Sequence, residues 1–212
     1  MRIFLTGGTG FIGGEVARLL RERGDEVVAL VRTPAKARAL AGCELVEGDL
    51  SSADVLRSAM SGVDAVIHGA AVYSIGIPAS ARPAMADANV GGTSRVLSAA
   101  LEAGVSRAVY VSTIAVFGNT RGQVAAEDWQ RPAGLGFTSA YEQTKVEAHQ
   151  EAQELCARGL PLVTVQPGVV YGPGDTSEMG GSPLVARPPP GSSRAWHRSA
   201  KWSGPRWASR PT

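Results

Sequence analysis

The feature that most constrains this chain is a glycine turn that joins an apolar segment to a helical one near the N-terminus. Residues 2–6 have the composition of a short buried strand, and residues 11–23 carry apolar side chains at helical spacing. Between them, glycines stand three residues apart at Gly7, Gly10 and Gly13. In such a unit the first glycine permits the tight turn, the second lets a phosphate approach the backbone, and the third lets the helix lie close to the sheet. The pattern predicts a dinucleotide pyrophosphate at the helix N-terminus, and the strand-turn-helix setting disfavours a purely structural turn.

Segments of strand and helix alternate along the chain after this turn. Near-continuous apolar runs are typical of parallel strands covered on both faces. The predicted strands span residues 2–6, 26–31, 44–50, 64–71, 107–112 and 160–166, and the predicted helices span 11–23, 33–40, 84–103 and 139–158. This order predicts an α/β fold with a doubly wound parallel sheet, the Rossmann architecture.

The composition is that of a soluble globular domain, with 212 residues of which 44% are hydrophobic and 19% charged. No apolar run is long enough to span a membrane, and the chain enters its first strand without a signal-peptide core. We therefore expect a cytoplasmic protein with no membrane partner. Cys43 and Cys156 lie far apart and outside metal-ligand spacing, so neither a disulfide nor a metal site is expected.

The end of the second predicted strand carries information about the cofactor. At this point of a dinucleotide-binding fold an acid accepts from the 2′-hydroxyl of NAD, whereas a basic residue accommodates the 2′-phosphate of NADP. The strand ends in Arg32 without an acid, which favours NADP, although an Arg32 that is only a solvated charge would leave the choice open. Asp49 and Leu50 follow the third strand where adenine would lie. Ala70 and Ala71 follow the fourth, and their small side chains suit close passage of a cofactor.

Other polar side chains fall at strand ends or inside a predicted helix. His68, on the fourth strand, is expected to be structural rather than catalytic. Asn89, inside the predicted helix 84–103, is either solvated or bridges backbone groups near the site. Ser112 and Thr113 end the fifth strand at the carboxyl edge of the sheet, where ligands of open α/β folds bind.

Tyr141 and Lys145 stand four residues apart at the start of the last predicted helix, so their side chains share one face. A tyrosine hydroxyl with its ordinary pKa of about 10 is a poor base, and a nearby ammonium lowers that pKa. Taken alone, an exposed helical pair would be the better interpretation. Because the pair follows a glycine turn and a strand that ends in Ser112 and Thr113, a catalytic role for Tyr141 and Lys145 is favoured.

Together these segments resemble the extended short-chain dehydrogenase/reductase family of NAD(P)-dependent epimerases, dehydratases and reductases. Seven blocks are similar to the family in the same order, at residues 6–13, 48–50, 68–71, 89–93, 112–118, 141–145 and 166–175. The strand end at residues 30–32 is similar to that of dihydroflavonol-reductase-like members and hopanoid-associated sugar epimerases, which the resemblance links to NADP. Gln166 departs from the arginine that the family often has at that position.

The resemblance implies roles for individual residues. Tyr141 would be the general acid/base, and Lys145 would lower its pKa and donate to the nicotinamide ribose. Thr113 would hold the substrate oxygen, with Ser112 as a second claimant. The implied cofactor-binding residues are Gly7, Thr9, Gly10, Phe11, Ile12, Gly13, Arg32, Asp49, Leu50, Ala70, Ala71, Asn89, Tyr141, Lys145, Pro167 and Gly168.

The implied function is an NAD(P)-dependent oxidoreductase or epimerase, with NADP favoured over NAD. It would transfer hydride at a carbonyl or alcohol carbon of a sugar nucleotide or related small molecule. The alternative is a non-catalytic NADP-binding sensor or partner protein that keeps the fold. The presence of Thr113, Tyr141 and Lys145 favours the enzyme. The chain could also form a homodimer.

Composition changes abruptly at the C-terminal end. Residues 182–212 hold 6 Lys and Arg and no acid, 6 of the 13 prolines and 3 of the 4 tryptophans. We expect residues 1–181 to form the dinucleotide-binding domain and residues 182–212 a disordered basic tail, with the family's substrate lobe largely absent and turnover poor. A gene read out of frame after about codon 181 explains this composition. We expect no nucleic-acid partner, because the tryptophans lack a supporting domain.

Overall fold

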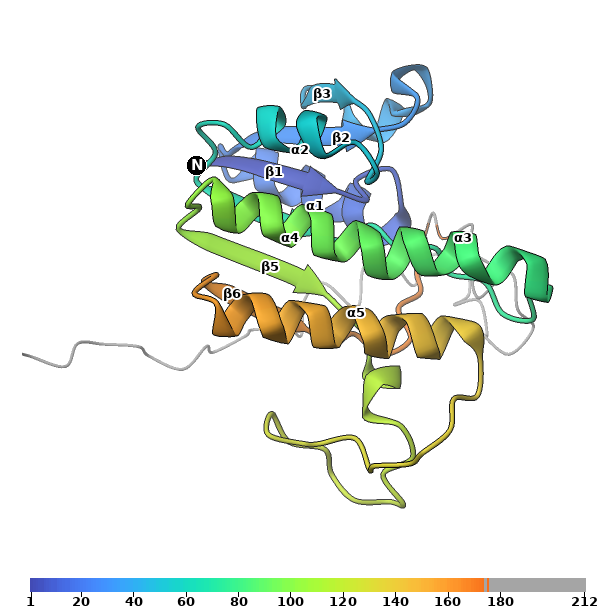
Figure 1. The fold of residues 1–212 in the computed structure, drawn as a ribbon. Coiled ribbons are helices and arrows are strands. Elements are labelled where there is room, and N and C mark those ends of the chain that lie inside the picture. Colours follow the sequence, from blue (N-terminus) through green and yellow to red (C-terminus); the bar gives the residue numbers. More distant parts are fainter. Residues whose placement is uncertain (174, 176–212) are drawn as a thin grey trace, which may run out of the picture. The chain divides into compact units, whose positions relative to one another are not determined.

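The computed structural model describes residues 1–173 and 175. They form one sheet of parallel strands in the order β3-β2-β1-β4-β5-β6 (Figure 1). This confirms the doubly wound Rossmann fold, with its topological switch point between β1 and β4. The strands are β1 (Arg2–Thr6), β2 (Glu26–Val31), β3 (Glu44–Glu47), β4 (Ala65–His68), β5 (Arg107–Val111) and β6 (Leu162–Val165).

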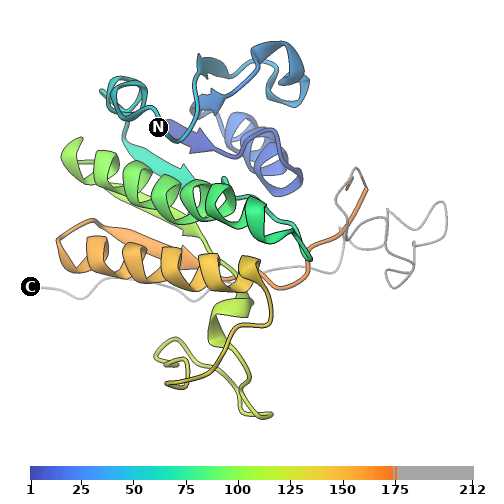
Figure 2. The same cartoon turned by 45° about the vertical axis from the view of Figure 1, so that its right-hand side comes forward.

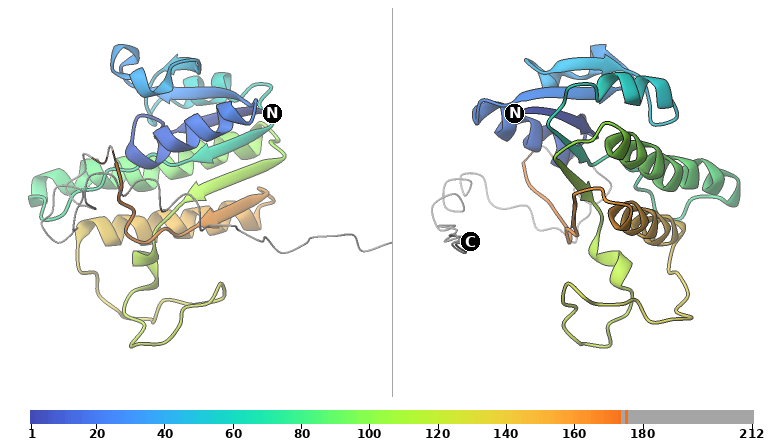
Figure 3. Two further views of the ribbon diagram at one scale, coloured as in Figure 1. Left: turned by 180° about the vertical axis from the view of Figure 1, so that it is seen from behind. Right: turned by 60° about the vertical axis from the view of Figure 1, so that its left-hand side comes forward.

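Helices cover both faces of the sheet. On one face lies α1 (Phe11–Glu22), seen in front of the sheet in Figure 3, left. On the other face lie α2 (Ala53–Ala59), α4 (Gly92–Glu102) and α5 (Ala140–Ala157), with α4 and α5 side by side in Figure 2.

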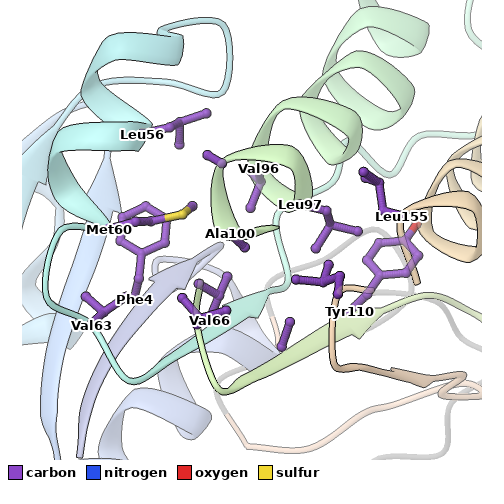
Figure 4. Close-up of a cluster of buried hydrophobic side chains, with 14 of the residues drawn as sticks. Phe4, Leu56, Met60, Val63, Val66, Val96, Leu97, Ala100, Tyr110 and Leu155 are labelled. Carbon is purple, nitrogen blue, oxygen red and sulfur yellow. The ribbon is translucent and has the colours of Figure 1, made fainter. Parts of the chain in front are cut away.

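Two apolar cores follow from this layering, and the side chains of β1 alternate between them. Ile3 and Leu5 pack with α1, whereas Phe4 packs with α2, α4 and neighbouring strands (Figure 4). Because both faces are buried, the sequence of β1 reads as a continuous apolar run rather than an alternating one.

The long helix predicted over residues 84–103 is present, and it contains an irregular turn. It comprises α3 (Arg82–Ala86), the π-helical turn η4 (Asp87–Gly91) and α4. A Cβ on Gly92, the first residue of α4, would lie 2.7 Å from the end of the Leu50 side chain, which would have to move to admit a larger residue. Such π turns occur frequently at functional sites.

Several predicted elements differ in the structure. The helix expected over residues 33–40 is two 3-10 turns, η1 (Pro34–Lys36) and η2 (Arg38–Leu40), because the Ala37 backbone between them leaves the helical region. The sequence interpretation missed α2 altogether, and the third and fourth strands end three residues earlier than predicted, at Glu47 and His68. Two further 3-10 turns are η3 (Ala79–Ala81) and η5 (Ile114–Phe117). The predicted boundary after residue 181 and the tail lie outside the described residues.

The outermost strand, β6, has apolar side chains that face solvent. Val163 is 60% exposed and Val165 39% exposed, on a strand that pairs with β5. Helix α5 covers the opposite face of this part of the sheet (Figure 1).

The start of α1 fits against the glycine turn with no space to spare. Gly7 has φ +77°, the left-handed conformation that glycine adopts without strain. A Cβ on Gly13 would lie 2.1 Å from the Gly7 carbonyl oxygen, which is far inside van der Waals contact. The positions thus confirm the tight turn at Gly7 and the close helix packing at Gly13.

This packing predicts opposite effects at two adjacent glycines. Gly13→Ala must push α1 away from the turn and should lower the free energy of unfolding by about 1–3 kcal/mol. Gly14→Ala is the matched control: its Cβ would meet the Gly8 carbonyl at 3.4 Å, an ordinary contact, and should stabilise the helix by about 0.5–1 kcal/mol. Urea unfolding followed by circular dichroism measures both. Equal effects of the two substitutions would contradict the prediction.

Candidate active site

A pocket of about 550 Å³ opens at the carboxyl ends of the central strands. This is where ligands bind in open α/β sheets. Its lining includes eight of the residues predicted to bind a cofactor: Gly7, Thr9, Gly10, Arg32, Asp49, Leu50, Ala70 and Ala71. The remaining lining residues were not predicted: Thr6, Leu30, Val31, Gly48, Ser51, Gly69, Val72, Asp87, Ala88 and Arg95.

The glycine turn and the N-terminus of α1 lie at the pocket, where Gly7, Thr9 and Gly10 line it. The first hydrogen bond inside the helix runs from the Gly14 amide to the Gly10 carbonyl, over 2.8 Å. The amides of Phe11, Ile12 and Gly13 precede it and therefore have no acceptor within the helix. The first turn carries no acidic side chain, so its positive dipole end can meet an anion without competition.

The pocket wall also carries two carboxylates, Asp49 and Asp87, and two arginines, Arg32 and Arg95. The Asp49 carboxylate accepts from the Ser51 amide, over 2.8 Å, and from the Ser51 hydroxyl. These hydrogen bonds, with smaller contributions from Arg32 and Arg95, lower the pKa of Asp49. The Arg32 side chain lies at the end of β2 and lines the pocket without an acid beside it in the sequence. A basic residue at this place is what the sequence analysis required for a 2′-phosphate.

Arg95 is a pocket residue that the sequence analysis missed. Its Nε donates to the Leu50 carbonyl over 2.6 Å, and its guanidinium pairs with Asp87 at 3.1 Å. It thereby ties α4 and the π turn to the loop after β3. No periodic signal distinguishes Arg95 from a solvated helical arginine, because its partners lie in distant segments.

A buried histidine connects the central strands behind the pocket. His68 is fully buried, with Nδ1 2.7 Å from the Thr6 hydroxyl and Nε2 3.0 Å from the Thr93 hydroxyl. Thr93 donates its own proton to the Asn89 carbonyl, so it must accept from Nε2–H, and Nδ1 accepts from Thr6. Burial, with a smaller contribution from the charge of Lys145, lowers the pKa of His68 to about 3. The expected structural role of His68 is therefore confirmed.

Asn89 is buried, and its side-chain amide bridges backbone groups. Of the two predicted alternatives, solvated or bridging, the structure shows the bridging one. Its Oδ1 accepts from the Val72 amide over 2.7 Å, and its Nδ2 donates to the Val72 carbonyl and the Thr144 hydroxyl, both over 3.0 Å. It is not among the residues that line the pocket, whereas Val72 is. Asn89 thus connects the pocket wall at Val72 with helix α5 at Thr144.

A well-capped helix start positions Tyr141. The Ser139 hydroxyl caps α5 by accepting from the Glu142 amide over 3.0 Å, and the Glu142 carboxylate accepts from the Thr138 amide over 2.6 Å. Arg131 pairs with Glu142 at 2.9 Å and anchors the preceding loop. Burial opposes ionisation of Glu142, but these hydrogen bonds and Arg131 leave its pKa below the ordinary value.

The Tyr141 ring lies half-buried between two partners. It meets the Tyr73 ring edge-on, with centroids 4.7 Å apart. Burial and then Tyr73 raise the pKa of Tyr141, and a hydrogen bond with Thr113 partly offsets them. The structure thus brings the predicted Thr113 and Tyr141 hydroxyls together. Ser112 points elsewhere, with its hydroxyl 3.2 Å from Nδ1 of His149.

Lys145 is buried, but its contacts differ from the prediction. Its ammonium donates to the Tyr110 hydroxyl over 3.1 Å and to the Val111 carbonyl over 3.0 Å. The expected lowering of the Tyr141 pKa by Lys145 was wrong for this structure, because burial dominates and the ammonium is engaged by another tyrosine. Burial also lowers the pKa of Lys145 to about 8.

Pro167 and Gly168 follow β6 and lie close to the segment that follows β5. The Pro167 carbonyl accepts from the Ile114 amide over 3.1 Å, directly after Thr113. Neither Pro167 nor Gly168 lines the pocket, and the same holds for Phe11, Ile12, Gly13, Tyr141 and Lys145.

The described residues contain neither a metal-binding cluster nor a membrane-spanning helix. Within residues 1–173 and 175, His, Cys, Asp and Glu side chains form no group of three that could hold a metal ion. None of the described helices combines the length and the apolar character needed to cross a membrane.

Comparison with known proteins identifies relatives of several activities. The chain is 37% identical to "Putative dihydroflavonol 4-reductase" of Synechocystis sp. over 87% of this chain and 53% of that protein. It is 32% identical to the 3β-hydroxysteroid dehydrogenase/Δ5→4-isomerase of Mycobacterium tuberculosis over 82% of this chain and 48% of that protein. The chain therefore spans about half the length of these curated relatives.

The fold also resembles that of a solved structure. MoeE5 in complex with UDP-glucose and NAD superposes with a TM-score of 0.66 at 30% identity, covering 82% of this chain and 56% of that one. The sequence pattern of the NAD dependent epimerase/dehydratase family matches residues 3–187. From its glycine turn to the start of α5, the chain carries the features described above in the family's order, and it belongs to the NAD dependent epimerase/dehydratase family, among the extended short-chain dehydrogenases/reductases.

Proposed function

We propose that this chain carries the cofactor-binding and proton-transferring half of an NADP-dependent oxidoreductase. Its substrate would be a small carbonyl compound or the corresponding alcohol, with sugar nucleotides as one class. The observation that carries the proposal is the paired hydroxyls of Thr113 and Tyr141, at the same sheet edge as a pocket suited to a dinucleotide.

The residues present fit the proposed cofactor. The acid-free first turn of α1 would hold the pyrophosphate, and Arg32 would face the 2′-phosphate. Asp49 and Leu50 would border the adenine. Lys145 uses two of its three N–H groups on Tyr110 and Val111, which leaves the third for the nicotinamide ribose.

The ionisation of Tyr141 favours one direction of proton transfer at neutral pH. Because burial raises its pKa, the phenol stays protonated and can donate to a carbonyl oxygen that Thr113 also holds. When bound, NADPH supplies the hydride. In the reverse direction Tyr141 must accept the alcohol proton, so alcohol oxidation should gain from higher pH.

A non-catalytic NADP-binding protein is the alternative. Such a protein has no need of hydroxyls placed side by side at the sheet edge. The sugar-nucleotide class is supported by the UDP-glucose in the MoeE5 complex, and reduction of other carbonyl compounds by the names of the curated relatives.

Cofactor choice gives the first test of this proposal. Calorimetric titration should show tighter binding of NADPH than of NADH. Arg32→Ala removes the charge proposed to face the 2′-phosphate, so NADPH affinity should fall roughly 10-fold or more while NADH affinity stays within about twofold. Arg38→Ala, a nearby arginine that does not line the pocket, is the matched control. Equal affinity for both cofactors in the unaltered chain would refute the NADP preference.

Hydride transfer gives the second test. Absorbance at 340 nm follows NADPH with a dihydroflavonol, and NADP reduction with a 3β-hydroxysteroid or UDP-glucose. Tyr141→Phe should lower any turnover by about 10²–10⁴-fold and leave NADPH affinity unchanged. Tyr171→Phe removes an exposed hydroxyl and serves as the control. Turnover that survives in Tyr141→Phe excludes Tyr141 as the acid/base, whereas NADPH binding without turnover of any probe favours the non-catalytic alternative.

A further inference from the structure

Lys145 is a buried ammonium whose contacts are all to uncharged groups. Its residue is only 2% exposed, and its nitrogen donates to the Tyr110 hydroxyl and the Val111 carbonyl. No carboxylate of the described residues pairs with it. An ammonium in such surroundings loses its hydration and depends on the few oxygens that replace water.

Tyr110 is the only side chain among the described residues that accepts a hydrogen bond from the Lys145 ammonium. It is 1% exposed and fixed among apolar side chains, next to Leu155 in Figure 4. Its ring lies under the ammonium, with the nitrogen 4.8 Å from the centroid, and its hydroxyl accepts from the same nitrogen. Both contacts favour the charged form of Lys145.

The Tyr110 hydroxyl is itself oriented by its neighbours. Hydrogen bonds with Thr93 and Ser112 work against burial, which raises the pKa of Tyr110 to about 12. This hydroxyl stays protonated at every physiological pH, and its oxygen accepts from the Lys145 ammonium. The other titratable groups that face Lys145 are His68 on β4 and His149 on α5, and its charge lowers the pKa of both.

We propose that Tyr110, not Tyr141, is the tyrosine that positions Lys145 and keeps it charged. Its hydroxyl, together with the Val111 carbonyl, holds two of the three N–H groups and aims the third at the site. The role this gives Lys145 in the reaction rests on the function proposed above, but the contact itself does not.

The chain offers a direct measurement of this contact. It contains three lysines, Lys36, Lys145 and Lys201. Labelling lysine with ¹³C therefore gives three Cε titrations by NMR, and loss of one in Lys145→Arg assigns it. In the unaltered chain Lys145 should titrate near its lowered pKa of about 8. In Tyr110→Phe, which keeps the ring and removes the hydroxyl, its midpoint should fall by about one pH unit.

Tyr171→Phe is the matched control, and it should leave the Lys145 titration unchanged. An unmoved midpoint in a folded Tyr110→Phe variant would overturn the proposal. Should that variant fail to fold, the unaltered chain still decides, because a nuclear Overhauser effect is expected between the Lys145 Cε protons and the Tyr110 ring. Its absence would equally overturn the proposal. None of these readouts requires cofactor binding or turnover, so they stand apart from a failure of the proposed function.

Where turnover is measurable, its pH dependence separates positioning from a merely structural role. In Tyr110→Phe the loss in kcat should be small near pH 6, where Lys145 stays charged in both proteins, and should grow toward pH 8. A loss of equal size at every pH would show that Tyr110 only stabilises the fold.

Discussion

The neutral imidazole of His68, next to the topological switch point, connects strand β1 with helix α4. His68 accepts from Thr6 on β1 and donates to Thr93 on α4, while the Ala70 amide donates to the same Thr6 hydroxyl over 3.3 Å. Thr6 and Ala70 also line the pocket, so its wall is fixed from inside the core. Because every proton in this chain of hydrogen bonds has one consistent direction, charging the histidine would force the network to rearrange.

Two tyrosines share the neighbourhood of one lysine and have different environments. Tyr110 is buried in the core and its hydroxyl accepts from the ammonium, whereas Tyr141 is half-buried beside Thr113 and Tyr73. A side chain that transfers protons must meet substrate, and one that holds a charge in place must not. Under the proposed function, burial would therefore assign different roles to two chemically identical groups.

Local patterns predicted most of the fold, and long-range contacts account for what they missed. Apolar segments located the strands, and the glycine spacing located the turn at the start of α1, because both signals lie within a few residues. The Leu50 carbonyl that Arg95 contacts, and the partners of Asn89 and Lys145, are 17 to 55 residues away in sequence, beyond any periodic signal. The pair Tyr141 and Lys145 was recognised as sharing a helix face, but spacing could not reveal that Tyr110 competes for the ammonium. Helix α2 was missed because seven residues give too few turns for a clear period.

The valines of β6 set a practical limit on handling the protein. The strand is four residues long and stands between Pro161 and Pro167, so its edge offers few backbone groups to an added strand. Its face is different: Val163 and Val165 present branched apolar surface to water. Contacts between such surfaces in different molecules remove that area from solvent, so self-association should rise steeply with concentration and salt. Replacing the outward valines with threonine, which keeps the branched shape, would raise solubility without touching the pocket.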